Sequence, residues 1–174
     1  MTALTASMIA AHGYAHARQW LDGLRSNLAR RPQGNDRAQV KAIYHGLCDV
    51  ALINHYYMAK MLADPKQKSW AESVRVIFPN QSGRGTHMNV SGVALTKHAP
   101  HRSSAIALME FLASEQGQAL YAKENGEYPV TSGVPWNALQ RSWGKFHQDS
   151  LSLATIADHR ARAVRLADEV GYDD

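Results

Sequence analysis

The chain has 174 residues, 45% of them hydrophobic and 20% charged, which is the profile of a globular protein with one well-buried core or lobe. No stretch approaches the roughly 20 consecutive apolar residues of a membrane helix, so we expect no membrane-spanning segment. The formal charge of +4 comes from scattered Lys and Arg residues rather than from the dense basic stretches of a nucleic-acid-binding module. We therefore do not expect a nucleic acid as a partner.

The single cysteine, Cys48, excludes a disulfide within the chain. It lies in the apolar run Leu47–Ala51, where a buried free thiol is expected. The first ten residues have neither the positively charged start nor the long apolar stretch of a secretory signal, so no signal peptide is visible in this chain.

The first predicted helix runs from about Tyr14 to Leu28, because apolar residues recur there at helical spacing on one face. A turn-rich stretch follows, and Asp36 is expected to cap the next helix with Gln39 as its capping-box partner. That helix is expected to turn its apolar residues inward, namely Val40, Ile43 and Tyr44.

Three segments have the composition of β-strands. Gly46 is well placed to end the preceding helix, and residues 49–54 then form an apolar run with polar residues at both ends, which predicts a buried strand. A helix is predicted from Tyr56 to about Leu62, closed by a proline. Further strands are expected at residues 74–78 and, with a bend or bulge, at residues 87–96.

Helices dominate the rest of the chain. Ser103 and Ser114 are expected to cap two successive helices, and Glu127–Val130 is expected to be extended because a proline follows Tyr128. The last helix is predicted from Thr155 to Val170. Three or four strands beside at least six helices predict an α/β fold, helix-rich with a small mixed sheet whose partner strands lie outside this chain.

The segment with the most chemical content is Asn54-His55-Tyr56-Tyr57, at the end of a predicted strand and the start of a predicted helix. Ligand sites of open α/β sheets lie at such ends. Neighbouring side chains diverge by about 100° on a regular helix, so two adjacent tyrosines converge on one ion only at an irregular junction. Phenolate oxygen is a hard anionic donor that suits ferric iron.

Other interpretations compete with this one. Adjacent tyrosines more often form an aromatic pair packed at a surface, and Gly83-Arg84-Gly85 is more often a turn than part of a phosphate-binding loop. His12 and His16 have helical spacing, but a chance solvent-facing pair is the more frequent case. No Ser, His and Asp set can be assembled from their order alone, so we do not expect an enzyme.

Motifs along nearly the whole chain resemble the second lobe of the periplasmic ferric-iron-binding proteins, the substrate-binding components of iron(III) ABC transporters in the type II periplasmic-binding-protein superfamily. In chain order the matching segments are Arg31–Arg37, Val40–Ile43, Cys48–Asn54, Tyr56-Tyr57, Phe78–Gln81, Gly83–His87, Asn89–Gly92, Thr96–Ala99, Glu127–Val130 and Leu166–Gly171. Many separate motifs in the family's order make this resemblance specific.

The resemblance implies a pair of α/β lobes that hold Fe(III) in a cleft through tyrosines, among them an adjacent pair. Tyr56 and Tyr57 match that pair, and Asn54 matches an asparagine that helps to bind a synergistic anion such as carbonate or phosphate. Asn35, beside a helix N-terminus, is a further anion-binding candidate. A turn or capping role is the alternative for Asn35.

This chain departs from the family in its extent. The further iron ligands that the family supplies from the first lobe have no counterpart, so we expect the chain to be the C-terminal portion of such a receptor. By resemblance, residues 1–86 form the second-lobe segment with the tyrosine pair, residues 87–137 cross back toward the first lobe, and residues 138–174 return to the second lobe. Apolar surface left open in this way is expected to be covered by rearrangement, by formation of a homodimer or by aggregation.

The leading hypothesis is thus a ferric-iron solute-binding component of an ABC-type uptake system, periplasmic by resemblance, whose partner is the transporter's permease. It would be truncated and lack the first-lobe ligands. Two alternatives stay open: a receptor for an anionic or organic solute, and an orphan lobe that self-associates without a transport function.

Overall fold

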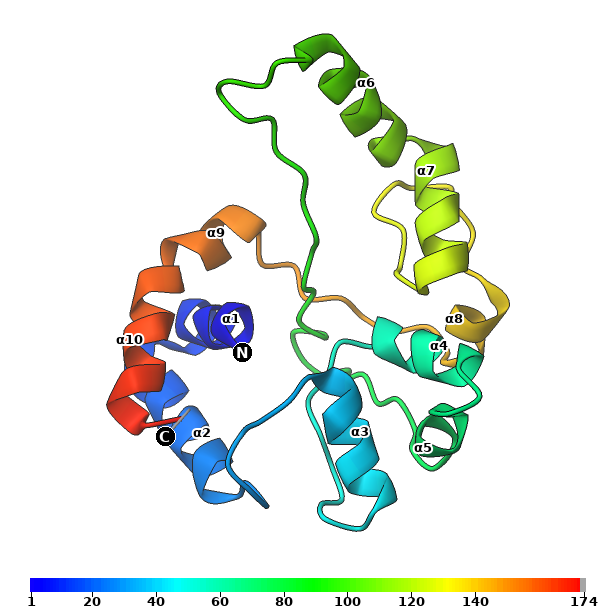
Figure 1. Ribbon diagram of the computed structural model, residues 1–174. Helices are drawn as coiled ribbons and strands as arrows, with labels where there is room; N and C mark the ends of the chain where they lie inside the picture. The colour runs from blue at the N-terminus through cyan, green and yellow to red at the C-terminus, as the bar shows by residue number, and fades with distance from the viewer. Residues whose placement is uncertain (173–174) are drawn as a thin grey trace. The chain divides into compact units, whose positions relative to one another are not determined.

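In the computed structural model, which describes residues 1–172, the chain divides into two compact units (Figure 1). Unit 1 consists of Met1–Ala38, Ile77–Asn89 and Phe146–Asp174. Unit 2 consists of Gln39–Val76 and Val90–Lys145. Each unit is therefore built from segments that are distant in the sequence.

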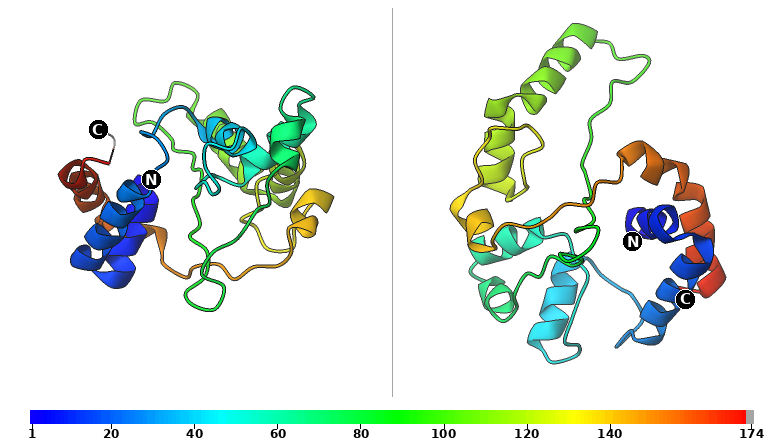
Figure 2. Two further views of the ribbon diagram at one scale, coloured as in Figure 1. Left: turned by 90° about the horizontal axis from the view of Figure 1, so that it is seen from below. Right: turned by 180° about the vertical axis from the view of Figure 1, so that it is seen from behind.

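Unit 1 is a bundle of four helices. These are α1 (Thr2–His12), α2 (Tyr14–Ser26), α9 (Leu153–Asp158) and α10 (Arg160–Val170). Helix α1 packs against the other three, as both Figure 1 and Figure 2 show. The core contains Ala6, Ile9, Ala17, Leu21, Ile156, Ala163, Leu166, Val170 and Tyr172.

Two ends of this bundle differ from the sequence-based prediction. Helix α1 was not predicted, because it is enclosed by neighbours and lacks the one-sided apolar stripe of a surface helix. The single C-terminal helix expected from Thr155 is instead two helices that meet at His159, and Ser152 caps the first of them through the amide of Thr155. Ile156, Ala163, Leu166 and Val170 of these two helices face the core, whereas His159 between them is half-buried.

Two extended segments of unit 1 run side by side. Thr86 and Gln148 form a parallel β-bridge, in which the Thr86 amide donates to the His147 carbonyl at 2.9 Å and the Asp149 amide donates to the Thr86 carbonyl at 2.9 Å. The Gln81 side chain adds to this pairing, because its Nε2 donates to the His147 carbonyl and its Oε1 accepts from the His147 amide. Gly85 is required here, since its φ is +92° and a Cβ would lie 2.6 Å from the Gln148 backbone.

A buried ion pair ties the same segments to α1. Arg84 Nη2 lies 3.4 Å from Asp149 Oδ2, and the two side chains are only 19% and 5% exposed. The Arg84 guanidinium also donates to the Ser7 carbonyl at 3.1 Å and to the Ser7 hydroxyl at 2.7 Å. Removing either charge would leave the other one buried without a counter-charge.

Unit 2 holds most of α3 (Asp36–Tyr44) and six further helices among the described residues. These are α4 (Tyr56–Ala63), α5 (Lys68–Glu72), α6 (Arg102–Ala113), α7 (Glu115–Leu120), the π-helix η1 (Tyr121–Asn125) and α8 (Ala138–Ser142). A small core forms from Val40, Met58, Met61 and Ala71. Helix α6 buries none of its residues.

The predicted small mixed sheet is not formed within residues 1–172. Residues 49–54, 74–78 and 87–96 belong to no assigned strand, and the Thr86–Gln148 bridge stands alone among the described residues. Apolar side chains of the expected buried strands are instead open, with Val50 78% and Ile77 76% exposed. The physical reason is that a strand needs a neighbouring backbone for its hydrogen bonds, and these segments find none within the described residues. The helix-rich character was predicted correctly.

Several helix ends also need correction. Asn35, not Asp36, caps α3, because its side-chain oxygen accepts the Ala38 amide at 3.2 Å. Tyr44 is 45% exposed, whereas its neighbour Ala42 is buried. Helix α6 begins at Arg102 without the cap expected from Ser103, while Ser114 does cap α7.

Candidate functional site

The tyrosine pair opens helix α4 in unit 2. A coil segment ends at Asn54, whose carbonyl accepts the Tyr57 amide at 3.2 Å, and the His55 carbonyl accepts the Met58 amide at 2.9 Å. Tyr56 is the first residue of the helix. The pair thus occupies a coil-to-helix junction, as the sequence predicted, although the coil is not a strand.

At this junction the two aromatic rings lie together. The ring centroids of Tyr56 and Tyr57 are 4.5 Å apart, and the ring planes differ by 30°, so the rings are stacked. Both residues are half-buried. Adjacent residues inside a regular helix would diverge by about 100°, so the irregular entry is what brings the rings side by side.

Each ring has a second neighbour. Tyr57 packs against the core cluster of unit 2, which fixes that ring to the body of the unit. The ammonium of Lys60, one turn further along α4, lies 5.4 Å from the centre of the Tyr56 ring. This distance is within the range of a cation–π contact, which holds the Tyr56 ring against its own helix.

His55 connects this junction to a distant part of unit 2. Its Nε2 lies 3.1 Å from the carbonyl oxygen of Gly126, the residue that ends η1. The imidazole meets Tyr56 edge-on with ring centroids 6.2 Å apart, lies 4.8 Å from the Tyr128 ring, and meets Trp143 at 5.8 Å. Burial lowers the pKa of His55, against the opposing effect of the hydrogen bond to Gly126.

Gly126 can make this contact only as a glycine. Its φ is +71°, and a Cβ at this position would lie 2.4 Å from the Cβ of Ala59 in α4. The chain after η1 is therefore pressed directly against α4. Beyond it, burial raises the pKa of Tyr128 to about 12.

The two asparagines predicted to bind an anion lie in different surroundings. Asn54 is half-buried and directly precedes the His55 turn in unit 2. Asn35 is exposed, belongs to unit 1 and caps α3. The structure thus groups Asn54, His55, Tyr56 and Tyr57 in one turn of unit 2.

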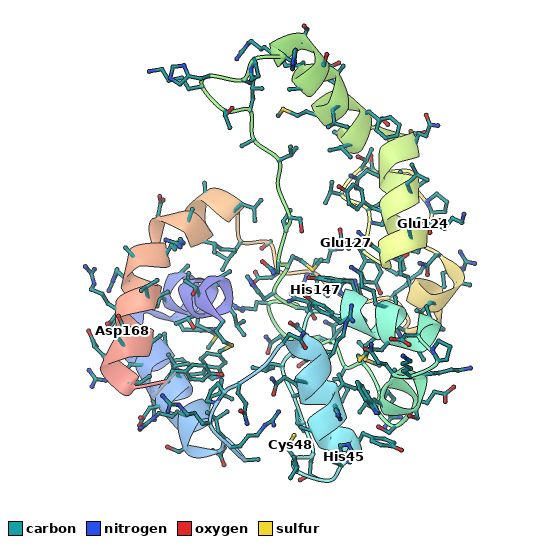
Figure 3. The ribbon with its side chains drawn as sticks, in the orientation of Figure 1. His45, Cys48, Glu124, Glu127, His147 and Asp168 are labelled. Carbon is teal, nitrogen blue, oxygen red and sulfur yellow. The ribbon has the colours of Figure 1, made fainter. Side chains whose placement is uncertain are left out.

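Other metal-binding side chains are sparse. Within residues 1–172, no group of three or more His, Cys, Asp and Glu residues is arranged to hold a metal ion. The rings of His12 and His16 are 5.1 Å apart on exposed helix surface. Cys48, labelled in Figure 3 near His45, is a half-buried free thiol. No helix in the same range is long and apolar enough to cross a membrane.

Residues 1–145 match the family described as bacterial extracellular solute-binding protein. The match covers most of the chain, including the tyrosine pair. The chain belongs to this family. Its type II periplasmic-binding-protein fold is likewise shown by solved structures that it resembles closely over nearly its full length.

Among its relatives in the family is iron uptake protein A1 of Synechocystis, 47% identical over 97% of this chain and 48% of the relative. The solved apo ferric ion-binding protein A of Pasteurella haemolytica is 48% identical, with a TM-score of 0.95 over 99% of this chain and 54% of that protein. A Trichodesmium protein in complex with iron and citrate is 40% identical, with a TM-score of 0.91 over 98% of this chain and 55% of that one. The chain thus spans about half the length of the relatives it matches.

Sequence reasoning singled out the tyrosines and Asn54 but passed over His55. The sequence did contain a local indication of its role, because a histidine between an asparagine and a tyrosine pair must lie in the same turn as they do. Its partner Gly126 lies 71 residues further along the chain, and no local pattern could have joined the two.

Proposed function

We propose that this chain carries the iron-binding tyrosine pair of a ferric-iron solute receptor, and that Tyr56 and Tyr57 coordinate Fe(III) through their phenolate oxygens. The observation that supports this most directly is the stacking of the two rings, with centroids 4.5 Å apart, at the entry to α4. Membership of the solute-binding family and the names of the iron-binding relatives add to it.

The geometry suits a small, hard cation. Metal–oxygen bonds in proteins are about 2 Å long, as in zinc sites. Two oxygens bound to the same ion are therefore at most about 4 Å apart. Rings stacked at 4.5 Å can present their hydroxyl groups within that span. A free tyrosine has a pKa near 10, so the ion must displace both phenol protons, and iron affinity should fall as the pH falls.

Two phenolates leave most of the iron shell to other donors, because ferric iron generally takes about six. We propose that Asn54 contributes by contacting an anion that shares the ion, with carbonate, phosphate or citrate as candidates. The Trichodesmium relative was solved with iron and citrate, which supports an anion of this class. Asn35 stays a weaker proposal for the same role, since its side-chain oxygen already accepts the Ala38 amide.

In this proposal the whole receptor works in the periplasm and delivers iron to the permease of an ABC transporter. An ion held by donors from both sides of a cleft binds the closed state more tightly than the open one, and so shifts the population toward closure. The permease would then distinguish loaded from empty receptor by that closure.

The test is a titration of the purified chain with ferric citrate, followed by absorbance of the phenolate-to-iron charge-transfer band. Tyr56→Phe and Tyr57→Phe should each weaken the band, and the double variant should abolish it. Tyr44→Phe is the matched control, because Tyr44 is an exposed tyrosine at the end of α3. A band that survives in the double variant, or that disappears with Tyr44→Phe, would refute the assignment.

A further inference from the structure

His55 sits where three structural elements of unit 2 meet. It precedes the first residue of α4, its Nε2 is 3.1 Å from the carbonyl that ends η1, and its ring lies against Tyr128 and Trp143. The imidazole is half-buried, so its hydrogen bond is partly shielded from water. A side chain with so many fixed contacts has little freedom to rotate.

The hydrogen bond has a defined direction. A backbone carbonyl can only accept, so the proton must lie on Nε2 of His55. Gly126 brings its carbonyl within reach because nothing but a glycine fits against Ala59 there. The contact therefore sets the position of the His55 ring, and through the backbone it sets the turn from Asn54 to Tyr57.

The same ring also borders the tyrosine pair. His55 and Tyr56 meet edge to face at 85°, with centroids 6.2 Å apart, and Tyr56 in turn stacks on Tyr57. A change in the His55 ring would let Tyr56 swing away from Tyr57. Groups that hold ligand side chains in place affect metal affinity even though they do not touch the ion.

We infer that His55 is a positioning residue for the iron site, which holds the Tyr56–Tyr57 stack in register by anchoring the turn to the Gly126 carbonyl. This inference rests on the proposed function for its meaning in iron binding. The placement of the two rings by His55 is a property of the iron-free chain and can be measured separately.

The informative variants keep or remove the donor. His55→Gln retains an N–H donor close to the position of Nε2, whereas His55→Phe retains a flat ring and loses the donor. His45→Phe is the matched control, because His45 is an exposed histidine just after α3, labelled in Figure 3. Urea unfolding of each variant shows whether it is folded before any other comparison is made.

The first measurement uses no metal. With ¹³C-labelled tyrosine, ring signals of Tyr56 and Tyr57 are assigned from the single Tyr→Phe variants, and ring-current shifts report the stack. The Tyr57 signal reports the stack, because Tyr57 stacks on Tyr56 whereas the His55 ring itself lies against Tyr56. His55→Phe should move the Tyr57 signal toward the value of an unstacked ring, while His55→Gln and His45→Phe should leave it in place. An unchanged Tyr57 signal in a folded His55→Phe chain would overturn the inference.

The second measurement is the ferric citrate titration. His55→Phe should weaken iron binding about 10-fold and shift the charge-transfer band, and His55→Gln should restore both to within about twofold. Equal affinity and an equal band in His55→Phe would overturn the role in iron binding. A wild-type chain without any band would sink the proposed function instead, and the tyrosine signals would still decide whether His55 positions the rings.

Discussion

Gly126 gives the sharpest test of the packing around the tyrosine pair. At this position φ is +71°, and a Cβ would lie 2.4 Å from the Cβ of Ala59. A non-glycine residue in the left-handed region costs about 1 kcal/mol or more, and overpacking costs about 1–3 kcal/mol. Gly126→Ala should therefore lower the free energy of unfolding by about 2–4 kcal/mol.

Gly46 is a matched control for the backbone effect. It has the same φ of +71°, but a Cβ there meets nothing within 4 Å. Gly46→Ala should cost only about 1 kcal/mol. Urea unfolding followed by tryptophan fluorescence suits both variants, because unit 2 contains Trp70, Trp136 and Trp143.

A thermodynamic cycle separates the clash from the strain. Ala59→Gly removes the methyl group that the new Cβ would meet, at a cost of about 1 kcal/mol in helix propensity. Combined with Gly126→Ala it should recover about 1–3 kcal/mol relative to the sum of the single changes. Additive costs, or a Gly126→Ala variant no less stable than Gly46→Ala, would show that the chain after η1 is not pressed against α4.

Three further predictions concern charged and titratable groups. Arg84→Met should lower the free energy of unfolding of unit 1 by about 3 kcal/mol or more in urea titrations, because Asp149 is left buried and uncompensated. Arg18→Met, which breaks an exposed pair of the same unit, should change it by less than about 0.5 kcal/mol. Burial lowers the pKa of His87, so at acidic pH the folded chain binds fewer protons than the unfolded one, and the free energy of unfolding should decrease below about pH 6.5. His87→Leu should flatten this pH dependence, and an unaltered slope of unfolding free energy against pH would contradict the prediction. The pKa of Tyr128 is raised to about 12, so an alkaline absorbance titration should contain a step near pH 12, and stability should be lost as the pH rises through that value. A Tyr128→Phe chain that keeps this step would refute the prediction.

The helices could be predicted from the sequence because a helix satisfies its hydrogen bonds within one segment. The start of α4 at Tyr56 and the Ser114 cap of α7 both follow from local patterns. Strands cannot be predicted so locally, since residues 49–54 have the composition of a strand but find no ladder partner within residues 1–172. Composition identifies a segment that can form a β-strand, but the strand forms only where the rest of the fold supplies a neighbouring strand.

The candidate site divides in the same way. Adjacent tyrosines, their place at a helix entry and the asparagine before them are local features, and the sequence predicted that the rings converge there. The anchor of that turn was not predictable, because the hydrogen bond from His55 to Gly126 depends on how η1 packs on α4. The roles of Asn54 and Asn35 toward an anion stay predictions.

The segmented construction of unit 1 has a consequence for synthesis on the ribosome. Helices α1 and α2 are made before the other half of their core, because α9 and α10 follow about 130 residues later. At a synthesis rate of about 5–20 residues per second, α1 and α2 wait about 6–25 s for these partners. Closing a loop of that length costs about 4 kcal/mol in chain entropy, so the nascent helices depend on chaperones or on early folding of the segments between them to stay out of aggregates.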